Sequence, residues 1–117
     1  MRKRTMGFGL YADEDGLATV TGLVHRAVRA SGARLLSLDL AHRLPHSGTT
    51  AEEAYDFLAE QWAIEHPGQD AGARRAVLLS VRLECSLKTW RTVRKAVLHG
   101  LCPQGTAPHV CRVPWTS

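Results

Sequence analysis

VLLSVRLEC, residues Val77–Cys85, places an apolar side chain at every second position. A period of two is typical of a β-strand with one buried face. Two earlier stretches repeat this pattern, Met6–Tyr11 and Leu36–Leu40. The segments between and after them have apolar residues with a period near 3.6, which is typical of amphipathic helices. This alternation predicts one compact domain in which helices cover a sheet.

The alternating patterns extend from end to end, which predicts a single domain over residues 1–117. We expect strands at about residues 5–12, 34–43, 75–85 and 109–115, the last at a sheet edge because it contains Pro114. We expect helices at about residues 13–31, 50–66 and 87–99. Residues suited to helix ends flank them: Asp13, Thr50 with Glu53, and Ser86 at the starts, and Gly32 and Gly100 at the ends.

The strand positions that alternate with the apolar ones are mostly polar or small, whereas strands buried on both faces are continuously apolar. We therefore expect an α/β fold of the two-layer α+β kind, with three helices packed on one face of a four-stranded sheet in the order βαβαβαβ. The other face would meet water, a second subunit or a ligand. The order resembles the ferredoxin-like (split βαβ) fold, with an extra helix between the second and third strands. The expected core includes Leu36, Leu38, Leu58, Trp62, Leu79, Val81 and Trp90.

Charge is distributed unevenly along the chain, although the formal net charge is only +4. Residues 1–70 contain seven lysines and arginines against ten acidic residues, a net of −3. Residues 71–117 contain eight against Glu84 alone, a net of +7. A bipolar molecule of this kind attracts an anionic partner to one side, or pairs its acidic helix with the basic helix of a second copy.

The clearest candidate binding surface is a basic stripe on the last expected helix, opposite its apolar positions. Basic side chains at the start of the preceding strand and at the N-terminus would add to it. The candidate nucleic-acid-binding residues are Lys88, Arg91, Arg94, Lys95, Arg74 and Arg75. Such a set would neutralise several phosphates. We therefore expect a small non-enzymatic protein that binds an anionic partner, with nucleic acid as the leading candidate; a solvated helix face is the alternative.

Catalytic motifs are absent from the sequence, including phosphate-binding loops, nucleophile elbows and metalloprotease signatures. Residues Gly7–Ala12 match the letters of a dinucleotide fingerprint, but three carboxylates at the following helix start would repel a pyrophosphate. We expect no catalytic residues and no cofactor. Two other hypotheses remain open: a protein-interaction module of the inhibitor or immunity type, and a small enzyme or small-molecule binder that uses the outer sheet face around Tyr11, Asp39, Arg82 and Glu84.

Four potential zinc ligands lie close together in the sequence, His99, Cys102, His109 and Cys111, but their spacing matches no common zinc motif. We expect no metal to be bound. The sequence has neither a secretory signal nor an apolar run of membrane-spanning length, and its three cysteines are an odd number. These features predict a cytoplasmic protein with reduced thiols and no membrane partner.

Phe57 and Ile64 lie seven residues apart on a helix flank, outside the expected core side. Exposed apolar side chains at this spacing, together with an uncovered sheet face, predict a homodimer. The source is expected to be bacterial, because twelve arginines against three lysines are typical of a GC-rich genome.

Overall fold

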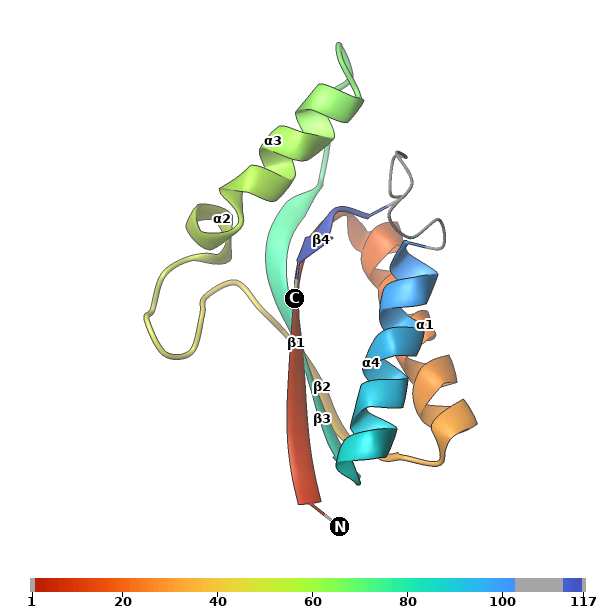
Figure 1. Ribbon diagram of the computed structural model, residues 1–117. Coiled ribbons are helices and arrows are strands. Elements are labelled where there is room, and N and C mark those ends of the chain that lie inside the picture. Colours follow the sequence, from red (N-terminus) through yellow and green to blue (C-terminus); the bar gives the residue numbers. More distant parts are fainter. Residues whose placement is uncertain (1, 103–112, 117) are drawn as a thin grey trace.

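The computed structural model describes residues 2–102 and 113–116 (Figure 1). The elements are β1 (Arg2–Ala12), α1 (Glu14–Ser31), β2 (Arg34–Ala41), α2 (Ala51–Ala54), α3 (Asp56–Glu65), β3 (Arg75–Cys85), α4 (Leu87–Leu101) and β4 (Trp115–Thr116). They form a compact α+β fold with a four-stranded antiparallel sheet, which confirms the expected fold class at this level. The part of the chain described contains four helices where the sequence predicted three.

The sheet has the strand order β2-β3-β1-β4. Its centre is the pair β1 and β3, which match residue for residue from Arg2 opposite Cys85 to Ala12 opposite Arg75. β1 therefore begins three residues earlier than expected, and the basic start of the chain is part of a strand. The expected strand at 109–115 falls largely outside the described residues; within them, β4 pairs with β1 only at Gly9 and Leu10.

α1 and α4 lie side by side on one face of the sheet and enclose the core with it (Figure 1). Asp13 caps α1 by accepting a hydrogen bond from the Gly16 N–H at 2.8 Å, and Gly32 follows the helix with a φ of 76°, as expected. The largest fully buried side chains of this core are Phe8, Leu10, Leu79, Leu83, Val20, Val24, Val77, Val81, Val93 and Val97.

The expectation that Gly100 ends the last helix is wrong, because α4 continues to Leu101 and its C-terminal cap is Cys102. A Cβ atom at Gly100 would lie 2.5 Å from Cδ2 of Leu23. The glycine instead lets α4 pass close to α1.

The prediction that Leu36 belongs to the core is also wrong. A β-bulge interrupts the pairing of β2 with β3 between Leu35 and Ser37. Because a one-residue shift turns side chains to the other face, Leu35 packs against the core in place of Leu36, while Leu38 does so as expected. Leu40 remains 45% exposed.

The prediction that every helix packs on one face is wrong, since α2 and α3 lie on the opposite side of the sheet from α1 and α4 (Figure 1). The cap at Thr50 forms as expected, with its side chain accepting from the Glu53 N–H, but the helix is interrupted at Tyr55. The ring of Tyr55 lies against Gly9, on the outer sheet face. Trp62 of α3 lies beside Tyr11, with 6.4 Å between ring centroids. Small residues on the outer face make room for these aromatic rings.

We expect Gly9→Ala to destabilise the fold by about 1–3 kcal/mol, the range for overpacking a well-filled site. A Cβ atom at Gly9 would lie 2.7 Å from the Tyr55 ring and 2.8 Å from Cγ2 of Thr116. Gly7→Ala is the matched control, because its Cβ would meet nothing closer than Leu78 Cδ1 at 3.5 Å. Urea unfolding of both variants measures the difference. Equal stabilities would contradict the placement of α2 and α3 against β1.

Candidate functional site

The basic stripe on α4 faces solvent. Ser86 starts the helix by accepting a hydrogen bond from the Thr89 N–H at 3.1 Å. Val93, Val97 and Leu101 are buried, which fixes the rotation of the helix and turns its opposite side outward. Lys88, Arg91 and Lys95, which we call the α4 basic face, are exposed on that side. With Leu87 and Thr92 they line an open groove of about 440 Å³.

The electrostatic setting of the α4 basic face favours anions. The first turns of α1, α2 and α3 contain acidic residues, whereas that of α4 contains none and holds Lys88. A cation there adds to the positive end of the helix dipole. Among residues 2–102 and 113–116, the ion pairs join Arg34 to Glu84 and Arg74 to Asp13, so neither involves the α4 basic face.

Positive charge continues from α4 towards the start of β1. A second hollow, of about 300 Å³, is lined by Lys3, Arg4, Thr5, Leu87 and Trp90. Leu87 lines both hollows, so the two surfaces adjoin. Arg94, the fourth predicted residue on α4, is half-buried and lies on the flank of the helix.

Arg74 and Arg75 lie at the other end of the molecule from the start of α4. Arg75 begins β3, which is eleven residues long, and α4 begins just after the other end of that strand. A strand of that length spans about 35 Å. The structure therefore brings Lys88, Arg91 and Lys95 together and places Arg74 and Arg75 apart from them.

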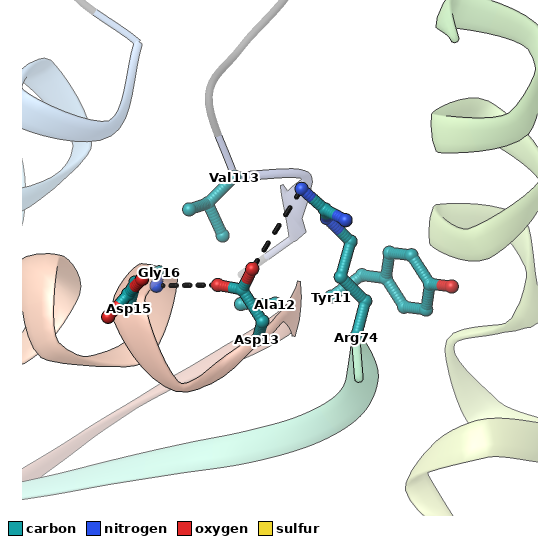
Figure 2. A pocket seen from close by; sticks show the side chains of 7 residues that line it. All are labelled: Tyr11, Ala12, Asp13, Asp15, Gly16, Arg74 and Val113. Atoms are coloured by element: carbon teal, nitrogen blue, oxygen red, sulfur yellow. Dashed lines mark hydrogen bonds and ion pairs between the residues drawn. The ribbon is translucent and has the colours of Figure 1, made fainter. Parts of the chain in front are cut away.

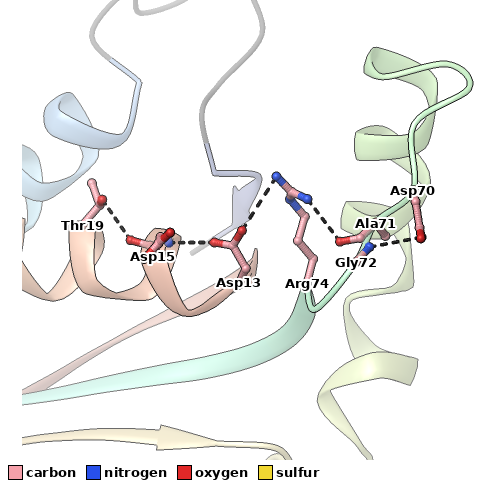
Figure 3. Close-up of polar contacts among 8 residues, drawn as sticks. Asp13, Asp15, Thr19, Asp70, Ala71, Gly72 and Arg74 are labelled. Carbon is pink, nitrogen blue, oxygen red and sulfur yellow. Dashed lines mark hydrogen bonds and ion pairs between the residues drawn. The ribbon is translucent and has the colours of Figure 1, made fainter.

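Arg74 belongs to a cluster of packed and paired side chains (Figures 2 and 3). Its guanidinium carbon lies 4.6 Å from the ring centroid of Trp62, and its amino groups reach an Asp13 carboxylate oxygen at 3.9 Å and the Ala71 carbonyl at 3.1 Å. His66 stacks on Trp62 with 4.5 Å between centroids. These contacts tie α3 and the β3 start to the capped end of α1.

A pocket of about 210 Å³ lies beside this cluster, lined by Tyr11, Ala12, Asp13, Asp15, Gly16, Arg74 and Val113 (Figure 2). The sequence gives no sign of this pocket, since its residues come from distant segments and follow no common motif. Two of its charged groups are already engaged with each other, since Asp13 caps α1 and pairs with Arg74. These contacts join α1 to the start of β3, and they indicate a structural role for Asp13 and Arg74.

The outer-face residues of the small-molecule hypothesis do not form one site. Glu84 pairs with Arg34 at 3.8 Å. Tyr11 lies opposite Ala76, six residues along β3 from Arg82, a separation of about 20 Å. Asp39, opposite Ser80, is nearer to Arg82 than to Tyr11.

Of the four potential zinc ligands, His109 and Cys111 lie outside the described residues, whereas His99 is on α4 and Cys102 caps it. Within residues 2–102 and 113–116, no group of three or more histidine, cysteine, aspartate and glutamate side chains is placed to hold a metal ion. None of the helices described is both long and apolar enough to cross a membrane.

The chain matches no protein-family model, and comparison with curated proteins and with solved structures gives no match.

Burial raises the pKa of the Tyr55 phenol above its ordinary value of 10.0. The folded protein therefore holds this proton more tightly than the unfolded chain. The corresponding stability is fully present below about pH 10 and is lost as the pH rises through the higher folded-state pKa. We expect the unfolding free energy of the wild type to fall more steeply between about pH 9 and pH 11 than that of Tyr55→Phe. Urea unfolding at several pH values measures this, and equal slopes would contradict a raised pKa of the Tyr55 phenol.

Proposed function

We propose that this protein is a non-enzymatic binding protein that recognises an anionic polymer, with nucleic acid as the leading candidate, through the α4 basic face. The observation that carries the proposal is the set of three exposed cations along one open groove. No carboxylate of the described residues neutralises them. Cations held on a rigid helix and left unpaired are suited to phosphates, because binding releases condensed counterions from the polymer.

The position of the acidic residues supports binding of a polyanion at the α4 basic face. Glu52, Glu53, Asp56, Glu60 and Glu65 belong to α2 and α3. These helices lie across the sheet from α4 (Figure 1). A polyanion approaching the molecule is repelled from one side and attracted to the other, which steers it to the α4 basic face.

We infer that the fold is a variant of the ferredoxin-like arrangement. In support, β1 and β2 flank β3 in a split βαβ unit, and β4 lies on the far side of β1. In this interpretation α2 and α3 are an insertion before β3. We also propose that the protein acts in the cytoplasm of a bacterium, where Cys85, which is buried, stays reduced.

Replacing Lys88, Arg91 and Lys95 together by alanine is expected to weaken binding to single- and double-stranded nucleic acid whatever the sequence. The slope of log affinity against log salt should fall by about one for each lost phosphate contact. Folding should persist, because exposed substitutions change stability by about 0.5 kcal/mol or less each. Fluorescence anisotropy with labelled oligonucleotides over a range of salt concentrations measures both effects.

The matched control removes three exposed arginines elsewhere, Arg26, Arg29 and Arg82, and changes the net charge equally. It should retain most of the affinity. Equal loss in both triple variants would mean that net charge alone attracts the polymer. A wild-type protein that binds neither RNA nor DNA at low salt would reject the proposal.

We also propose that the protein forms a homodimer through α3. In support, Phe57 is 46% exposed and Ile64 is 79% exposed. Light scattering at micromolar concentration is expected to give twice the chain mass, and Ile64→Lys to give the monomer mass, because a two-fold contact places the substituted residue in the interface twice. A monomeric wild type would contradict the proposal.

A further inference from the structure

Among residues 2–102 and 113–116, one edge of β1 has backbone groups that no strand pairs with. β4 pairs with β1 at Gly9 and Leu10, and the Tyr11 N–H donates to the Pro114 carbonyl at 3.1 Å. Figure 1 shows β4 beside only one part of β1. The described residues include no strand that pairs with the remaining part of this edge, from Arg2 to Phe8.

The direction of the backbone groups follows from the hydrogen bond of Tyr11. Backbone N–H and C=O groups point to alternate sides along a strand, so those of Gly7, Thr5 and Lys3 point to the same side as those of Tyr11. The intervening residues bond to β3. Lys3, Thr5 and Gly7 are exposed. An extended segment of five or six residues, an ordinary strand length, would therefore find three donors and three acceptors in line.

A hollow beside this edge could accept side chains of a bound segment. The hollow of about 300 Å³ lies along it, between Lys3, Arg4 and Thr5 of β1 and Leu87 and Trp90 of α4. Its walls combine two apolar side chains with two cationic ones. Arg4 is oriented by its Nε–H, which donates to the Cys85 carbonyl at 3.2 Å. A partner strand that alternates acidic and apolar side chains would match both the cationic and the apolar walls of this hollow.

Charge selects the partner of this edge. Arg2, Lys3 and Arg4 stand in succession at its open end. A second copy paired through the same edge would offer Arg2–Phe8, a segment with three cations and no acidic residue. The same charges attract a segment rich in aspartate and glutamate.

We propose that the open edge of β1 binds an acidic peptide segment by strand addition, in line with β4 along the same edge. Backbone pairing with Lys3, Thr5 and Gly7 supplies the hydrogen bonds, and the cations at the start of β1 select acidic side chains. This site is distinct from the α4 basic face, because it binds a peptide through backbone hydrogen bonds, whereas the α4 basic face would bind phosphates.

The test uses the full chain and a capped hexapeptide that alternates glutamate with valine, followed by amide NMR and hydrogen exchange. We expect the Thr5 and Gly7 amides to exchange quickly in the free protein and to become protected when the peptide binds. The same peptide with lysine in place of glutamate should bind at least tenfold more weakly. Methylation of the peptide nitrogens that face β1 should weaken binding about fivefold for each hydrogen bond lost.

Variants of β1 separate the edge from its side chains. Thr5→Pro removes an edge donor at a position where proline leaves the ladder to β3 intact, and Thr5→Val is the control that keeps the donor. The proline variant should lose the protection at Gly7, and the valine variant should keep it. If the proline variant fails to fold, the methylated peptides measure the same bond on the wild-type protein.

The remaining outcomes overturn the proposal. These are no peptide binding at millimolar concentration, equal binding of the lysine peptide, protection confined to α4, and pairing of two copies through β1. An oligonucleotide that protects Thr5 and Gly7 more strongly than the peptide would assign the edge to nucleic acid instead. The variant lacking Lys88, Arg91 and Lys95 should still protect these amides with the peptide, so failure of the α4 proposal is distinguishable from failure of this one.

Discussion

The antiparallel pairing of β1 with β3 is the constraint on which the other elements depend. Eleven residues of each strand match without a shift, so the two ends of the ladder are fixed relative to each other. One end, at Ala12 and Arg75, leads into the capped start of α1 and the Arg74 cluster. The other end, at Arg2 and Cys85, leads into α4 and brings the basic start of β1 beside it.

The two faces of this ladder differ because their side chains differ in size. The inner face presents large apolar side chains such as Phe8 and Leu79, which α1 and α4 cover. The outer face presents Gly7 and Gly9, and the absence of a side chain at Gly9 creates the space that the Tyr55 ring fills. Trp62 then holds α3 in place through Tyr11 and Arg74. The outer face of β1 thus packs against the aromatic rings of Tyr55 and Trp62, although its residues are mostly small or polar.

The sequence predicted features that local physics determines. The bounds of β3, the caps Asp13, Thr50 and Ser86, and the left-handed Gly32 depend on neighbouring residues only. It did not predict the bulge that exchanges Leu36 for Leu35, because register is set by the partner strand. Helical periodicity shows which side of a helix is buried, but not against which sheet face. That is why α2 and α3 were misplaced.

In the candidate site too, only the features that depend on neighbouring residues could be predicted. The grouping of Lys88, Arg91 and Lys95 follows from helical spacing, whereas Arg74 and Arg75 look close in sequence and are separated by the length of a strand. Conversely, the start of β1 adjoins α4 through Leu87 despite its distance along the chain. Both anionic ligands proposed for this end would share its positive potential. Each would therefore weaken the other's binding, since two like charges on adjoining surfaces oppose each other and such coupling is reciprocal. Under the two proposals, the basic end would therefore hold one anionic ligand at the expense of the other.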